Sequence, residues 1–354
     1  MNKTYINGIG AVTPQGLTKR GELLPEICEF EEPFLQIQKP NFKEYVDAKS
    51  LRRMSKIVRM GVYAAFDAMK DVGVEQPDAI LTGTGMGCQK DTEKFLNSMI
   101  ENNETLLNPT AFMQSTHNTV GARIALMLEN KNENFTYVHR AFSFESALID
   151  SILMLAEPDK TTTLTGGIDE ITDESRLIKT HINHYKKTAS NNLKMLDDNQ
   201  PGGLAGEGSV FFVLSSEKSE KSYAAIEDIQ TFFMPENSEE IQHRLDTFLK
   251  RSSLSVSDID LVLMGYNGDP EFDLIYQNLE NTTFKNLAVG YFKHLTGEYD
   301  TVSAFAVLIG AKLISGEKLP QVILKKGSVK SPKKILIFNQ FRNINHAFIL
   351  LTDV

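Results

Sequence analysis

Residues 136–158 have the pattern of a buried strand, a sharp turn and a buried helix, which sets a side chain at a helix N-terminus. A thiol in that position is a good nucleophile, because the helix N-terminus lowers its pKa. The turn reads HRAFS, and its central residue is Ala141, whose methyl group cannot be acylated. Ser143 and Ser146 supply hydroxyls nearby but no paired base. With Glu145 in the first turn, they fit capping and helix-face positions better than nucleophiles.

A second set of polar residues follows strand-like runs in the C-terminal part. Lys293, His294 and Glu298 fall within FKHLTGE, and Asp269, Glu271 and Asp273 fall within NGDPEFD. The acidic set Asp269, Glu271, Asp273 and Glu298 could bind a divalent cation, but a solvated loop and one buried, hydrogen-bonded carboxylate are the favoured interpretation. A histidine on a structural loop is more often hydrogen-bonded than catalytic, and we interpret His294 in that way.

The two cysteines, Cys28 and Cys88, lack the spacing of a metal site and are interpreted as free thiols. Cys88 follows a glycine turn, where a reactive role is conceivable, but a small buried residue is the better interpretation. We therefore expect no metal and no cofactor.

Composition restricts the classes of function. The chain has 354 residues, 41% hydrophobic and 23% charged, which is ordinary for a soluble globular protein and large enough for about two domains. A net charge of -9 argues against nucleic-acid binding. The sequence shows neither a signal peptide nor an apolar run long enough to cross a membrane, so we expect a cytoplasmic protein without membrane contact.

Strand-like and helix-like segments alternate along the chain, which predicts an α/β fold with parallel or mixed sheets. Strands are expected at 4–9, 79–84, 162–165, 209–214, 259–264, 334–338 and 347–351, and helices at 50–72, 240–252 and 300–315. The charged run at 215–223 is interpreted as the junction between two halves, 1–215 and 216–354. A surface loop within one domain explains the same run.

Seven segments, in order, carry a resemblance that spans nearly the whole chain. They are INGIGAVTPQG (6–16), the helix at 51–74, LTGTGMG (81–87), TLTGGIDE (163–170), GGLAGEGSVFFVL (202–214), FKHLTGE (292–298) and FNQF (338–341). Together they resemble the β-ketoacyl synthases of fatty-acid and polyketide synthesis, and the resemblance implies a thiolase-type fold with two similar halves in an αβαβα layering. Residues 112–126 and 139–151 further resemble chain-length factors, the divergent ketosynthase-like proteins of aryl-polyene and flexirubin-type pigment clusters.

The resemblance implies that the catalytic groups of the family are missing. The family's cysteine nucleophile corresponds to Ala141, its first histidine to Gly265, Tyr266 or Asn267, with Tyr266 as the central choice, and its second histidine to Glu298. Lys293 is kept. The family's helix glutamate corresponds to Val307, and NQFRNINHAF (339–348) has lost the glycine run of the gating loop. The absence of two imidazole donors removes about 2.7–4 kcal/mol of transition-state stabilisation per donor.

Three functions fit this pattern. The first is a chain-length-factor subunit of an active ketosynthase, in which Phe112, Phe142, Phe144 and Phe341 line a tunnel or the dimer contact; ordinary core packing is the alternative for these rings. The second is an acyltransferase or condensing enzyme on carrier-protein or coenzyme A thioesters that uses Lys293 and Glu298. The third is a homodimer that binds acyl chains.

The expected partners are an active ketosynthase, or a second copy of the chain, and an acyl carrier protein. An acidic carrier needs a basic surface, and two groups of basic residues are candidates, although each also fits a solvated surface. They are Arg52, Arg53, Lys56 and Arg59, and Lys325, Lys326, Lys330, Lys333 and Lys334.

Overall fold

The computed structural model describes residues 3–16, 19–105, 107–188 and 191–354. Among them, eleven strands form one mixed sheet in the order β11-β10-β9-β12-β13-β8-β1-β7-β5-β3-β4. These strands are β1 (Thr4–Val12), β3 (Ala79–Gly83), β4 (Glu133–Tyr137), β5 (Thr162–Asp169), β7 (Gly208–Ser215), β8 (Ala224–Phe233), β9 (Leu261–Met264), β10 (Ala288–Tyr291), β11 (Leu324–Lys326), β12 (Lys334–Phe341) and β13 (Asn345–Thr352). A small separate sheet pairs β2 (Phe34–Leu35) with β6 (Ala205–Gly206).

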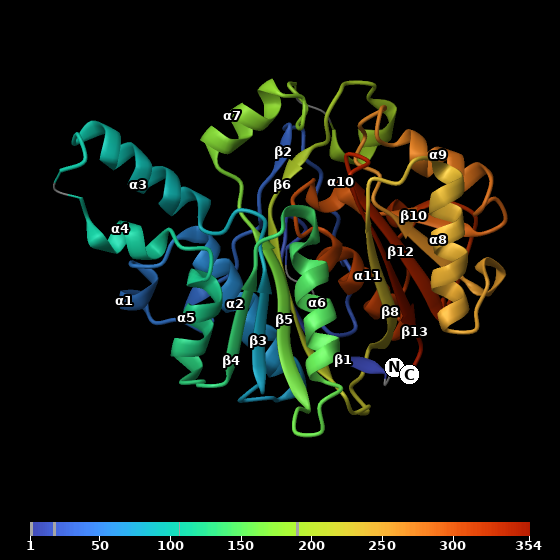
Figure 1. Cartoon of the computed structure of the whole chain (residues 1–354), viewed down its shortest axis with the longest axis horizontal. Helices are drawn as coiled ribbons and strands as arrows, with labels where there is room; N and C mark the ends of the chain where they lie inside the picture. Colours follow the sequence, from blue (N-terminus) through green and yellow to red (C-terminus); the bar gives the residue numbers. More distant parts are fainter. Residues whose placement is uncertain (1–2, 17–18, 106, 189–190) are drawn as a thin grey trace.

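The helices cover the sheet on both sides and project from it (Figure 1). They are α1 (Ala48–Leu51), α2 (Lys56–Val72), α3 (Gln89–Glu101), α4 (Pro109–Gln114), α5 (Thr119–Leu128), α6 (Ser143–Met154), α7 (Asp173–His181), α8 (Ser238–Arg251), α9 (Leu274–Asn281), α10 (Lys293–Thr296) and α11 (Ser303–Ile314). Alternating strands and helices confirm the predicted α/β class.

The large sheet uses one strand order twice. In the first half, β3 runs parallel to β4 and β5, and β7 lies antiparallel between β5 and β1. In the second half, β9 runs parallel to β10 and β12, and β13 lies antiparallel between β12 and β8. The β1–β8 pair joins the two sets. The two similar halves that the resemblance implies are therefore present in the topology.

Three hydrophobic clusters fill the spaces between the layers. One lies between α2, α5 and the strands of the first half, and another lies between α8, α9 and the strands of the second half. The largest surrounds α11 and the start of α6, which pack together in the middle of the molecule. Figure 1 shows the same order from one end of the molecule to the other, with α6 and α11 central. This is the expected αβαβα layering.

Two glycines in β1 explain how closely α2 packs on the sheet. A Cβ atom on Gly8 would stand 2.3 Å from the carbonyl oxygen of Ala68, and one on Gly10 would stand 2.1 Å from that of Ala64. No side chain fits at either position, because the opposing atoms belong to the helix backbone.

The single helix expected over 50–72 is wrong at its start. The structure has a short helix, α1, a turn at Arg52–Ser55, and then α2 from Lys56. Ser55 is extended, with φ −68° and ψ 169°, so the helix cannot run through it. The turn directs Met54 into the core and leaves Arg52 and Arg53 exposed. Gly73 ends α2 in the left-handed conformation, as predicted.

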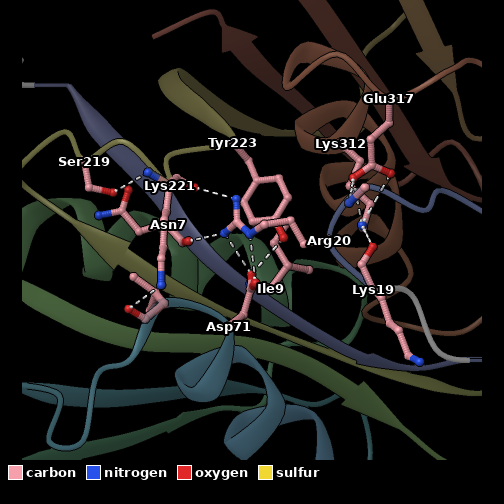
Figure 2. Close-up of polar contacts among 12 residues, drawn as sticks. Asn7, Ile9, Lys19, Arg20, Asp71, Ser219, Lys221, Tyr223, Lys312 and Glu317 are labelled. Carbon is pink, nitrogen blue, oxygen red and sulfur yellow. Dashed lines mark hydrogen bonds and ion pairs between the residues drawn. The ribbon is translucent and has the colours of Figure 1, made fainter.

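A network of polar contacts ties the N-terminal loop to both halves (Figure 2). The Arg20 guanidinium donates to the Asp71 carboxylate at 2.9 and 3.1 Å and lies 3.9 Å from the centroid of the Tyr223 ring. The Tyr223 hydroxyl and the Ile9 amide also donate to Asp71. Because Tyr223 directly precedes β8 and Asp71 lies on α2, the network joins the halves beside the predicted junction at 215–223.

No helix within the described ranges is long and apolar enough to cross a membrane.

Candidate functional site

The turn that carries Ala141 is built from a short 3₁₀ helix between β4 and α6. Arg140 has a positive φ of 52°, and Ala141 behind it is buried. Gly83, at the end of β3, makes room for this turn, because a Cβ atom there would stand 2.5 Å from the carbonyl oxygen of Ser143. The sharp turn and the buried helix expected from residues 136–158 are present, but the strand before them is not buried as expected, because β4 lies at the edge of the sheet.

Ser143 does not present a free hydroxyl at this turn. Its Oγ donates to the carbonyl oxygen of Arg140 at 2.6 Å and accepts from the His139 amide at 2.8 Å, and its side chain is fully buried. Both contacts hold the turn closed, so Ser143 acts as a structural residue at the helix start.

Lys293 and Glu298 form a buried ion pair at the second predicted position. The Lys293 Nζ lies 2.7 Å from the Glu298 Oε2, and the two residues are 1% and 4% exposed. The Asn267 Nδ2 donates to the same oxygen at 2.9 Å, and Lys293 also donates to the carbonyl oxygen of Gln340 at 3.4 Å. Segments 265–273, 292–298 and 338–341 therefore meet here, as the resemblance implies.

Of the three candidates for the first-histidine position, Asn267 is the one that reaches Glu298. The Tyr266 hydroxyl donates instead to Glu280 at 2.8 Å, and its ring packs 4.9 Å from the ring of Tyr276. We therefore place the polar group of this loop at Asn267 rather than at Tyr266, which sequence reasoning had put at the centre.

Backbone amides hydrogen-bond the carboxylates of the acidic loop after β9. Asp273 accepts from the Asn267 and Gly268 amides, and burial raises its pKa to about 7. Asp269 accepts from the Gly202 amide at 2.7 Å. Asp269, Asp273 and Glu298 are thus three buried, hydrogen-bonded carboxylates in a set where one was expected, and the part of the chain that the structure describes has no cluster of metal-ligating side chains.

Two further buried acids lie near the site. Glu145, which was expected in the first turn of the helix without a role of its own, is fully buried, and among the described residues neither of its oxygens has a hydrogen-bond donor. Burial raises its pKa to about 7, against the opposing effect of Ser303 and Lys293. Asp169 ends β5 and accepts from the backbone and hydroxyl of Thr301 and from the Gly85 amide. Burial, and then Asp300, raise its pKa to about 7. An acid at the end of the buried strand TLTGGID was the available signal.

The four phenylalanines predicted to line a tunnel do not gather at one place. Phe144 belongs to the central core, 6.0 Å from Phe212, and Phe142 is buried 5.5 Å from the ring of His139. Phe341 is half-buried beside His184, and Phe112 is exposed on α4. The core alternative fits Phe144, and tunnel or dimer roles for the other three stay predictions.

Cys88, the remaining candidate nucleophile, and His294, the remaining candidate base, are both uncharged near neutral pH. Burial, together with Glu170 and Asp91, raises the pKa of the Cys88 thiol to about 12, so it stays protonated. His294 is fully buried, its ring lies 3.9 Å from the ring of Tyr291, and burial lowers its pKa to about 3. Neither group is poised to titrate near neutral pH.

Comparison with known proteins decides the family. The model of the β-ketoacyl synthase N-terminal domain matches residues 6–220, more than half of the chain. The chain belongs to the β-ketoacyl synthase family. No curated protein sequence matches the chain.

Solved structures of this family share the fold along the whole chain. A β-ketoacyl synthase from Burkholderia phymatum STM815 superposes with a TM-score of 0.83 at 15% identity, covering 100% of both chains. The ketosynthase ApeO with its chain length factor ApeC from Xenorhabdus doucetiae gives 0.78 at 14%, covering 100% of this chain and 98% of the other. AntDE, a type II polyketide ketosynthase in complex with its carrier protein AntF, gives 0.78 at 13%, with 100% of both chains covered. The thiolase-type fold is thus confirmed.

Proposed function

We propose that this protein is a chain-length-factor type subunit that pairs with an active ketosynthase and does not condense acyl units by itself. The observation that carries the proposal is the combination of Ala141 at the nucleophile turn with the closed pair of Lys293 and Glu298 where imidazoles would stand. A decarboxylative condensation needs a thiolate to hold the acyl chain and two donors for the developing oxyanion. The named residues supply neither.

The ion pair also argues against a substitute chemistry at the same place. Lys293 already donates to Glu298 and to the carbonyl oxygen of Gln340, and Glu298 already accepts from Asn267. A buried pair that loses one partner is destabilised by about 3–5 kcal/mol. Moving either side chain out of the pair to contact a substrate would therefore destabilise the folded protein, which disfavours the acyltransferase alternative.

An exposed edge strand supports pairing with a second subunit. β4 is the outermost strand of the sheet, and its neighbourhood carries the exposed apolar side chains Phe135, Val138, Leu126 and Leu153. Open edges and apolar patches of this kind mark association sites. ApeO is a ketosynthase in complex with its chain length factor, and AntDE is a ketosynthase in complex with a carrier protein. By analogy, we assign this chain a ketosynthase partner and a carrier protein, in fatty-acid or polyketide-type synthesis of the aryl-polyene kind.

The test measures carbon dioxide release and intact mass after incubation with malonyl- and acyl-carrier protein. The chain alone is expected to show neither decarboxylation nor an acyl adduct, whereas a complex with an active ketosynthase makes product of defined length. The variant Ala141→Cys supplies a thiol but no imidazole, so it should still fail to decarboxylate. Carbon dioxide release by the purified wild-type chain would overturn the proposal, and self-association without a ketosynthase would favour the acyl-binding homodimer.

A further inference from the structure

Lys186, which follows α7, has a completely buried side chain. A lysine is almost never buried in this way unless its charge is paired. The buried Lys293 satisfies this rule with the Glu298 carboxylate at 2.7 Å. The Lys186 Nζ, in contrast, lies 3.5 Å from the carboxylate of Asp198. The ammonium of Lys186 must therefore gain most of its stabilisation from other atoms.

Backbone carbonyl oxygens form most of the shell around this ammonium. Within the described ranges, the Lys186 Nζ donates to three of them: to Gln200 at 3.0 Å, to Gly268 at 3.1 Å and to Asp198 at 3.4 Å. With the Asp198 Oδ2 they make a set of four oxygens, which we call the oxygen cage. Carbonyl oxygens that replace a hydration shell are the ligands that bind potassium ions in channels. The surroundings of Lys186 thus resemble those of a bound ion more than those of a surface salt bridge.

Contacts that do not involve the Lys186 side chain hold the loops of the oxygen cage together. The Asp269 Oδ2 accepts from the Gly202 amide at 2.7 Å, which joins the loop after β9 to the loop before β6. Gly268 has a φ of 79°, and a Cβ atom there would stand 2.7 Å from the carbonyl oxygen of Met195. Only glycine allows this conformation and this close approach. The oxygen cage should therefore keep its shape when the Lys186 side chain is shortened.

We propose that the oxygen cage is a monovalent-cation site whose resident cation is the Lys186 ammonium, and that a potassium or ammonium ion occupies it once the side chain is shortened. A lysine ammonium is a compact point charge, similar in size to these ions. Burial lowers the pKa of Lys186, but the carboxylates of Asp198, Asp269 and Asp273 oppose that effect. The same carboxylates favour any cation in the cage.

The resident cation links the two halves of the molecule. Gln200 lies in the first half and Gly268 in the second, and both donate a carbonyl oxygen to the same ammonium as ligands. Gly268 directly follows Asn267, whose side chain donates to Glu298. Loss of the cation leaves buried carbonyl oxygens without a partner, which destabilises the folded chain.

The test replaces Lys186 by Ala, which leaves room in the oxygen cage, and by Met, which fills a similar length without a charge. Urea unfolding of the full chain is measured at constant ionic strength in tetramethylammonium chloride, whose cation is too large for the cage, and in potassium or ammonium chloride. Both variants should be less stable than the wild type in tetramethylammonium chloride. Potassium or ammonium ions should raise the folding equilibrium constant of Lys186→Ala by about tenfold, which is about 1.4 kcal/mol.

The controls should not show this rescue. The wild type and Lys186→Met should respond equally little to the change of salt, because their cages are already filled. Lys187→Ala removes a charge from the next, exposed position and should match the wild type in every salt.

Three results would overturn the proposal: an equal response of Lys186→Ala and the wild type to potassium, an equal rescue of Lys186→Met, or failure of Lys186→Ala to fold in every salt. A second measurement uses the unaltered chain and follows the ammonium protons of its lysines by nuclear magnetic resonance. The protons of Lys186 should exchange with water far more slowly than those of the exposed Lys187, and equally fast exchange would contradict a caged ammonium. Decarboxylation and subunit pairing are measured separately, so failure here leaves the proposed function intact.

Discussion

At the scale of single residues, the important feature is the pair of buried acids Glu145 and Glu298. Glu145 sits one helical turn after Ala141 and is fully buried, and Glu298 is held by Lys293 and Asn267. Glu298 has an ammonium partner at 2.7 Å, whereas no donor among the described residues reaches Glu145. Because burial raises the pKa of Glu145 to about 7, this carboxyl keeps its proton in mildly acidic solution, where an ordinary glutamate is ionised.

Replacement of Glu145 by Gln should stabilise the protein increasingly as the pH rises from about 5 to about 7, with a constant gain at alkaline pH. The folded-state pKa is raised from 4.5 to about 7, so the folded state holds a proton that the unfolded state has lost, and stability falls as pH rises through that window. Glu145→Gln removes this fall and should gain roughly 2–3 kcal/mol over the wild type at alkaline pH and little near pH 5. Urea unfolding of both proteins at the two pH values measures the difference. Glu157→Gln, exposed just beyond the same helix, is the control, and a gain that does not depend on pH would contradict the explanation.

At the scale of elements, β4 is the edge strand that we propose as the contact with a partner subunit. Among the described strands it pairs only with β3, so the hydrogen-bonding groups of its other edge face away from the sheet. Phe135, near its middle, is 44% exposed. Because β4 leads directly into the turn of Ala141, a partner on this edge would also lie beside the site.

Phe135→Lys should weaken association with a ketosynthase partner at least tenfold, because it places a charge on the apolar edge. Stability of the isolated chain should change by less than about 0.5 kcal/mol, since the position is on the surface. Phe233→Lys is a matched control, as Phe233 is an exposed phenylalanine at the end of β8. Sedimentation of the mixed subunits gives the affinity. A larger loss for the β8 variant would show that association uses another face.

Elements were predicted well from the sequence where apolar periodicity was strong, and less well where tertiary contacts determine where an element begins or ends. Strands at 4–9 and 209–214 and the helix at 300–315 were found with ends shifted by a few residues, since fraying and capping determine where an element ends. The break at Ser55 escaped prediction, because Met54, Ile57 and Val58 fit one continuous helix equally well. In the site, Lys293 and Glu298 were identified from the motif and Asn267 was one of three alternatives. The contact of Asn267 with Glu298 and that of Asp169 with Thr301 join distant segments, which spacing alone does not reveal.

At the scale of the whole molecule, two halves with the same strand order share a central layer, and the Arg20 network joins them near residue 223. We propose 1–215 and 216–354 as the two structural units. Ala141 and Glu145 come from the first unit and Lys293, Glu298 and Asn267 from the second, and the charge of Lys293 acts to lower the pKa of Glu145 across the two units.

Asp71→Asn should destabilise the folded protein by about 2 kcal/mol, because Asp71 accepts from Arg20, Tyr223 and the Ile9 amide. Both halves are expected to unfold in one transition at lower denaturant concentration. Lys70→Gln, which removes the exposed pair with Glu44 from the adjacent position, should change stability by less than about 1 kcal/mol. Chemical denaturation followed by circular dichroism compares the three proteins. Equal effects of the two variants would show that the network is an ordinary surface feature.

The pairing of β1 with β7 has a consequence for how the chain is made. Tyr5 pairs with Ser215, and Thr4 pairs with Ile226, so the first strand leaves the ribosome long before its neighbours exist. At a synthesis rate of ~5–20 residues per second, β1 waits roughly 10–40 s for β7. During that time its apolar residues are open to wrong partners, because loops of this length close late in folding. Nascent chains arrested before residue 208 should therefore recruit chaperones at the N-terminus, and chains arrested well beyond residue 233 should not.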